Sequence, residues 1–189
     1  MPASQKLYSL APPDTPLPAA RALLRHARFR LREDYLAKIN LTLVALSDEQ
    51  IWWRPNAASN SIGNLLLHLC GNARQWIVAG VGGVADVRTR AAEFAAQGSL
   101  DKQGLLALLE NTLAEVDGVL DSVEREVAQH SDAPLERVIA PQGFPQTVLD
   151  AIFHVVEHFS YHTGQIVSLA KQVSGQPTRF YDERALNQE

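Results

Sequence analysis

The chain has almost no cysteine, since Cys70 is the only one among 189 residues. A single thiol excludes internal disulfide bonds and zinc clusters built from several thiolates. Long apolar runs are missing too: although 46% of the residues are hydrophobic, no segment offers the roughly 18 to 20 uninterrupted apolar residues that span a bilayer. The first residues lack the continuous apolar region of a secretory signal. We therefore expect a cytoplasmic protein without a membrane partner.

An excess of basic charge is also absent. The chain carries 17 Lys and Arg against 21 Asp and Glu, for a net charge of -4. Proteins that bind nucleic acids usually present a clustered excess of Lys and Arg. The composition therefore argues against a nucleic-acid partner and leaves a globular domain of ordinary composition.

Apolar residues recur every three or four positions in four long stretches, which is typical of amphipathic helices. A shorter helix is predicted after Ser47, where Ser-Asp-Glu-Gln has the spacing of a capping box. Four long helices in a chain of this length predict an all-α fold, a four-helix bundle. The stretches span residues 19–46, 61–80, 101–129 and about 147–173.

Proline and glycine mark the regions outside these helices. Five prolines in residues 1–18 predict an extended N-terminal arm. Residues 131–146 predict an irregular crossover with a short β-like segment before the last helix. We expect three regions: the arm at 1–18, the bundle at 19–175 and an irregular tail at 176–189.

The segment between the second and third long helices is polar. Residues 86–98, DVRTRAAEFAAQG, predict a charged linker or a short helix. Arg88 and Arg90 can pair there with Glu93, which we interpret as an ordinary surface interaction.

Three of the six histidines lie four residues apart in the last helix, in the sequence DAIFHVVEHFSYHTGQ. On an α-helix, residues four apart differ by about 40° in direction, so either His154 with His158 or His158 with His162 can reach one metal ion. Imidazoles hydrogen-bonded to water are the alternative. A metal is favoured because each buried neutral imidazole without a partner costs roughly 1 to 3 kcal/mol. An open site usually takes three protein ligands, and His68 in the second helix is the candidate third.

Other polar residues fall close to these histidines. Gln165 follows His158 by seven residues and so returns to nearly the same side of the helix, where it can line a cavity or orient a water. Asn72 lies one turn after His68. Glu157 and Tyr161 are adjacent in sequence to His158 and His162, and either can transfer a proton or simply form a hydrogen bond elsewhere.

The motifs SIGNLLLHLCGNARQW and HVVEHFSYHTGQI, some 80 residues apart, resemble the DinB-like superfamily of bacterial four-helix-bundle proteins. The resemblance covers residues from about 20 to 175. It implies a divalent metal, zinc or nickel, on His68, His158 and His162, with His154 lining the pocket or contacting the ligands. It also implies a homodimer.

The chemistry of such a site allows two reactions. An ion held by three neutral histidines lowers the pKa of bound water or of a coordinated thiol. Because relatives in the superfamily include thiol S-transferases, the resemblance favours attack by a low-molecular-weight thiol on an electrophilic small molecule. A metal-dependent hydrolase is the alternative, although no glutamate stands between the ligands as in H-E-x-x-H enzymes. A third hypothesis is a non-catalytic, metal-stabilised protein that binds a partner or acts in stress response.

Overall fold

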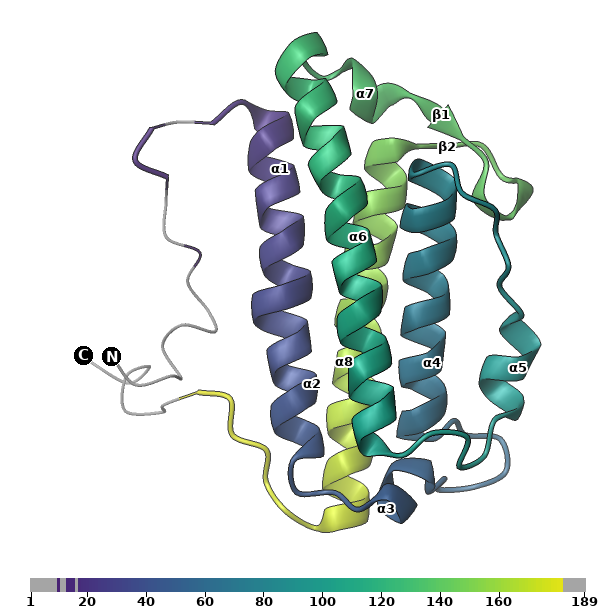
Figure 1. Ribbon diagram of the computed structural model, residues 1–189. Helices are drawn as coiled ribbons and strands as arrows, with labels where there is room; N and C mark the ends of the chain where they lie inside the picture. The colour runs from purple at the N-terminus through teal and green to yellow at the C-terminus, as the bar shows by residue number, and fades with distance from the viewer. Residues whose placement is uncertain (1–9, 11–12, 16, 182–189) are drawn as a thin grey trace.

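Four long helical columns stand side by side in the computed structural model, which describes residues 10, 13–15 and 17–181 (Figure 1). The all-α, four-helix-bundle prediction is confirmed. The first column is continuous through three segments, and the second through two, because α-helix passes directly into wider π-helical turns. The columns are α1 (Ala19–Arg28), η2 (Phe29–Tyr35) and α2 (Leu36–Leu43); α4 (Ile62–Ala73) and η3 (Arg74–Val81); α6 (Lys102–His130); and α8 (Val148–Ser174).

The helix starts follow the capping residues of the sequence. Ser47 accepts a hydrogen bond from the backbone N–H of Gln50 and begins the short helix α3 (Asp48–Trp52), as predicted. Ser61 and Thr147 form equivalent capping boxes at the starts of α4 and α8. These side chains satisfy N–H groups that have no partner within the helix.

The core is built from the apolar stripes that define the four columns. Large aliphatic side chains dominate it, and burying each one stabilises the fold by about 1.5 to 3 kcal/mol. This apolar interior makes the polar side chains buried near the middle of α4 and α8 unusual. Among the fully buried side chains are Leu24, Ile39, Leu43, Leu66, Leu69, Leu105, Leu109, Leu113, Phe159 and Ile166.

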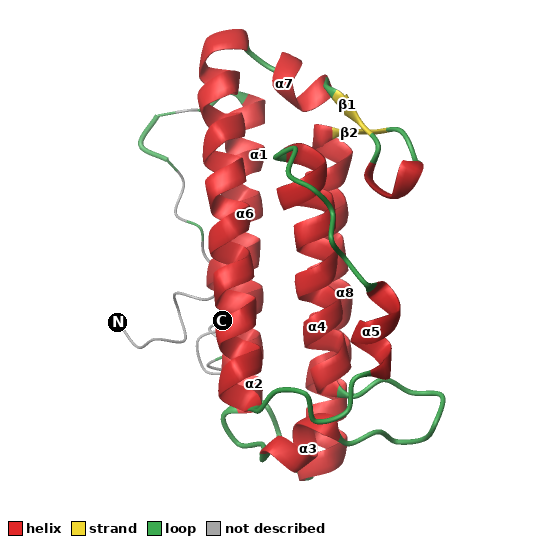
Figure 2. Ribbon diagram, turned by 45° about the vertical axis from the view of Figure 1, so that its right-hand side comes forward, coloured by secondary structure: helices red, strands yellow, loops and turns green. Residues whose placement is uncertain are grey.

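The connection between the second and third columns runs along the outside of the bundle. Figures 1 and 2 show α4 and α6 pointing the same way, so the chain returns beside α4 before α6 begins. We call this returning segment, residues 82–99, the strap. It contains the short helix α5 (Arg90–Ala95), which packs against α4 and brings charged residues to its side.

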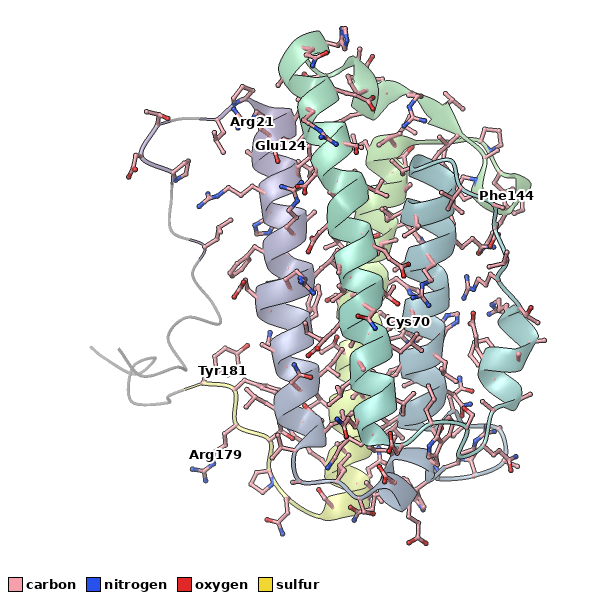
Figure 3. All side chains as sticks on the ribbon, in the orientation of Figure 1. Arg21, Cys70, Glu124, Phe144, Arg179 and Tyr181 are labelled. Carbon is pink, nitrogen blue, oxygen red and sulfur yellow. The ribbon has the colours of Figure 1, made fainter. Side chains whose placement is uncertain are left out.

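The crossover before the last helix contains the predicted β-like segment. Strands β1 (Val138–Ile139) and β2 (Gln146–Thr147) pair antiparallel, and a short helix, α7 (Ala133–Glu136), precedes them. Between the strands, η4 (Pro141–Gly143) forms a tight turn. It lies beside the end of the second column, near the labelled Phe144 in Figure 3.

Arginines of the first column pair with acids of α6. Arg28 contacts Glu124 at 2.7 Å and Asp121 at 2.6 Å, and Arg21 reaches the same Glu124 carboxylate, as Figure 3 shows. These pairs connect the first and third columns, as expected for a charged helix face.

The ends of the chain are described only in part. Most of the predicted arm at 1–18, and residues 182–189 of the predicted tail, lie outside the described residues, so the division into three regions stays a prediction. Residues 176–180 form neither helix nor strand. In the described chain, we find no helix with the length and apolar character to cross a membrane.

Candidate metal centre

Three histidine side chains from two columns meet halfway along the bundle. His68 lies on α4, and His158 and His162 lie one turn apart on α8. His158 Nε2 is 3.1 Å from His68 Nε2 and 3.1 Å from His162 Nε2. His68 and His162 are buried, and His158 is half-buried. The structure thus brings together the three residues that the resemblance implies as ligands.

The Nδ1 atoms of His68 and His162, which point away from His158, face oxygen atoms. His68 Nδ1 lies 2.8 Å from Glu93 Oε2, and His162 Nδ1 lies 2.7 Å from Gln165 Oε1. These oxygens favour the ring proton on Nδ1 in both cases, because a carboxylate and an amide oxygen can only accept. At His68 the shorter contact with Glu93 prevails over that of Arg88 Nη2, a donor 3.0 Å from the same Nδ1. Both rings therefore direct an Nε2 lone pair towards His158.

Glu93 reaches His68 because the strap holds it against α4. Arg88 binds its carboxylate through two nitrogens, Nε at 2.7 Å and Nη2 at 2.9 Å. Gly71 permits this approach, since a Cβ at that position would collide with the Glu93 carboxylate. Asn64 fixes the end of α5 by donating to backbone carbonyl oxygens, including that of Glu93 at 2.8 Å.

The surface interpretation of the Arg88 and Glu93 pair is therefore wrong. Both side chains are buried, with side-chain exposures of 4% and 10%, and their partner is a candidate ligand. Sequence reasoning missed Glu93 because its helix is too short to show a buried stripe. The only signal in the sequence was an acidic residue close to Arg88 and Arg90.

Burial favours the neutral forms of His158 and His162. It lowers the pKa of His158 to about 3, helped by the neighbouring His162 and His68. Burial also lowers the pKa of His162, against the opposing hydrogen bond to Gln165. Burial raises the pKa of Glu93, but hydrogen bonds from Arg88 and His68 outweigh it and the net pKa is lowered. At neutral pH, His158 and His162 are uncharged, as metal binding requires.

His154 lies outside the three converging nitrogens. Its Nε2 accepts a hydrogen bond of 3.0 Å from Asn72 Nδ2, and its ring stacks on Trp76 with centroids 4.0 Å apart. Burial lowers the pKa of His154 as well. With Nε2 engaged by Asn72, this histidine forms part of the wall beside the centre.

Of the other residues predicted to lie near the centre, one contacts a candidate ligand and two lie on the surface. Gln165 orients His162, as described above. Tyr161 is 65% exposed, with its ring edge-on to His162 at 5.0 Å between centroids. Glu157 is exposed and does not line the adjoining cavity.

A cavity of about 470 Å³ adjoins the three histidines. Its walls come from α4 and η3, α8, the strap and the η4 turn. Two of the converging histidines border it, so a small molecule inside can approach their nitrogens. The lining residues are His68, Asn72, Gln75, Trp76, Arg88, Arg90, Gln142, His154 and His158.

The donor set suits a divalent cation. With His68 and His162 both protonated at Nδ1, a proton on His158 Nε2 can satisfy only one of its two 3.1 Å contacts. The other contact places two lone pairs face to face. A cation removes this conflict. Ligands of tetrahedral zinc at 2.0 to 2.1 Å lie about 3.4 Å apart, and the ligand atoms of the three residues all lie within 4.8 Å of one another.

Comparisons with known proteins agree with this fold. No curated protein matches the chain. A solved DinB-like protein from Bacillus subtilis, YjoA, is similar over 83% of this chain and 98% of its own, with a TM-score of 0.57 and 15% identity. At that identity, the similarity shows the DinB-like fold alone. A family model described as "Protein of unknown function (DUF1572)" matches residues 19–180, and the chain therefore belongs to this DinB-like family.

Proposed function

We propose that this protein is a metal-dependent enzyme in which a low-molecular-weight thiol attacks an electrophilic small molecule, a reaction of the thiol S-transferase type. The observation that carries the proposal is the convergence of three imidazole Nε2 atoms beside an open cavity. His68, His158 and His162 would hold the ion. The zinc or nickel expected from the resemblance suits nitrogen donors.

The roles of the surrounding residues follow from their contacts. A divalent ion on three neutral imidazoles would supply Lewis acidity and lower the pKa of a coordinated thiol. Glu93 and Gln165 hold the rings of His68 and His162 with Nε2 directed inwards. The stacked rings of Trp76 and His154 form an aromatic part of the cavity wall.

The nucleophilic thiol must come from outside the chain. Cys70, the only cysteine, is buried, and burial raises the pKa of its thiol to about 11. No carboxylate lines the described cavity wall, so it lacks a general base for water of the kind that the H-E-x-x-H glutamate provides. The absence of this group from the described lining supports a thiol substrate over metal-dependent hydrolysis.

The test is a pair of assays on zinc-loaded and nickel-loaded protein. One follows consumption of glutathione, mycothiol or bacillithiol with an aromatic electrophile such as 1-chloro-2,4-dinitrobenzene, and the other follows hydrolysis of an ester panel without thiol. We expect turnover only when thiol is present, lost in His158→Ala and retained in His130→Ala, a histidine at the exposed end of α6.

The alternatives give different results. Ester turnover without thiol would establish the hydrolase and contradict the transferase. No turnover in either assay, combined with a large drop in melting temperature on chelation, would favour a non-catalytic, metal-stabilised protein.

The homodimer is a further proposal, supported by apolar residues on the outside of α8. Leu149, Phe153 and Tyr161 are 40%, 52% and 65% exposed. Exposed apolar groups gathered on one element often mark an interface. Light scattering should give a dimer mass that falls to the monomer mass in Phe153→Glu; a monomeric unaltered protein would contradict the proposal.

A further inference from the structure

The cavity beside the histidines has an uneven charge distribution. Arg88 and Arg90 line it, together with three carboxamide side chains, and the described lining contains no carboxylate. A ligand in this cavity meets hydrogen-bond donors and positive charge, which favour an anion.

The two arginines are not equivalent. Glu93 neutralises Arg88 through two contacts, and Arg88 is thereby fixed in place. Arg90 forms no ion pair with a described residue; its guanidinium lies 4.9 Å from the centre of the Phe94 ring. This stacking leaves the N–H groups in the guanidinium plane available to a ligand. Arg90 is thus the uncompensated cation of the described lining.

A network of amides fixes the wall near these arginines. Gln75 Oε1 accepts from Arg88 Nη1 at 2.8 Å and from Gln142 Nε2 at 2.7 Å. Its Nε2 donates to Asp86 at 2.6 Å. The second column, the strap and the η4 turn therefore meet at the Gln75 side chain. A cavity wall held in place in this way is suited to binding a specific ligand.

Gln142 is held in an uncommon conformation to join this network. Its φ of 57° and ψ of 18° place it in the left-handed region, which residues other than glycine seldom occupy. Asn and Asp tolerate this region better than Gln, and such strain concentrates at functional sites. The turn therefore presents Gln142 to the cavity at a conformational cost.

We propose that this cavity recognises a small carboxylate-bearing thiol, with Arg90 as the residue that reads the carboxylate and Gln142 as a second hydrogen-bonding group. The inference rests on the proposed function, because it names the chemical class of the thiol. A cavity of about 470 Å³ falls within the roughly 300 to 1,000 Å³ usual for small-molecule sites. Arg90, His68 and His158 line the same space, so one molecule can place one end at Arg90 and the other at the converging histidines.

Two probes that share a thiol test the proposal. N-acetylcysteine carries a carboxylate, and N-acetylcysteine amide has the same thiol without the charge. Each is titrated into the full-length protein loaded with Co²⁺, whose visible spectrum changes when a thiol binds, so that no catalytic turnover is needed. We expect the acid to bind about fivefold more tightly than the amide, the advantage of one partly exposed charged hydrogen bond.

The variant that isolates the charge is Arg90→Gln, which keeps a polar side chain at the rim. The ratio of the two dissociation constants should fall from about fivefold towards one. Arg125→Gln is the matched control, because Arg125 is exposed on α6 and hydrogen-bonds only Ser122 among the described residues. It should leave the ratio unchanged. Gln142→Ala should weaken the binding of N-acetylcysteine more than the binding of N-acetylcysteine amide.

The outcomes separate the two proposals. If neither probe alters the spectrum, the thiol-dependent function fails. If both bind with equal affinity, the thiol role stands and carboxylate recognition is overturned. If the acid binds more tightly but Arg90→Gln keeps the full ratio, then Arg90 does not read the carboxylate.

Discussion

His68 Nδ1 lies 2.8 Å from Glu93 Oε2, a contact that joins the second column of the bundle to the strap. A carboxylate in this position fixes the imidazole tautomer and raises the basicity of its other nitrogen. Because Arg88 holds Glu93 in turn, two residues outside the histidine motif of α8 determine how the candidate ligand His68 is presented.

Removing that carboxylate should weaken metal binding. Glu93→Ala is expected to lower zinc affinity about 10- to 100-fold, the usual effect of losing such a partner. Glu93→Gln should have a smaller effect, because its amide oxygen can still accept from His68. The measurement is competition with a coloured chelator. Glu126→Gln, at an exposed position of α6, is the control, and equal affinities for all four proteins would contradict the role of Glu93.

Substituting the candidate ligands should remove the metal. Protein purified without a nickel column should contain about one equivalent of metal, and His68→Ala, His158→Ala and His162→Ala should each lose it. His154→Ala should retain it, since the His154 Nε2 atom is bonded to Asn72. Elemental analysis distinguishes these cases, and unaltered protein without any metal would refute the central claim.

Chelation should destabilise the unaltered protein. A ligand present at 100 times its dissociation constant stabilises the native state by about 2.7 kcal/mol, or roughly 5 to 10 °C for a chain of this size. Calorimetry with and without a chelator measures the shift. The His158→Ala variant provides the reference, because its melting temperature should not respond to the chelator.

Cys70 should be chemically inert in the folded protein. It is buried, and burial raises the pKa of its thiol to about 11, so the thiolate is scarce and inaccessible at pH 8. We expect iodoacetamide to label the denatured chain and leave the native protein unlabelled over the same time, as followed by mass spectrometry. Rapid native labelling would show that the core opens around α4.

Acid should remove the contribution of Glu124 to stability. Burial raises the pKa of Glu124, but its contacts with Arg28 and Arg21 outweigh burial and lower the pKa overall. When folding lowers the pKa of a carboxyl group, its ionised form stabilises the folded protein at pH values above the unfolded-state pKa. This stabilisation is lost as the pH falls through the folded-state pKa. Glu124→Gln should therefore cost about 0.5 to 1 kcal/mol at pH 7 and progressively less as the pH falls towards 3.

Urea titrations of both proteins across this range measure that difference. Glu126→Gln is the control, because Glu126 is exposed and forms no ion pair with another described residue; its stability should match that of the unaltered protein. A cost for Glu124→Gln that stays constant from pH 7 to pH 3 would mean that the ion pair does not contribute.

The sequence by itself determined the bundle and the candidate ligands on α8. Apolar periodicity over 12 or more residues specifies a buried helix face, and capping boxes such as those at Ser47 and Thr147 specify where helices begin. The four-residue spacing of His158 and His162 is a local property of one helix, so it could be read directly. It could not distinguish that pair from His154 with His158; the family resemblance made that choice.

Only the tertiary structure decided what surrounds those ligands. The contacts of His68 with His158 and Glu93 span 90 and 25 residues, and no periodic pattern encodes such distances. Glu93 lies on a six-residue helix whose burial depends on a glycine in α4 and a buried asparagine. The charge of the cavity likewise depends on which arginine Glu93 neutralises. These features arise from packing between separate elements. That packing determines the role of Glu93, a charged residue that the sequence alone assigns to the surface.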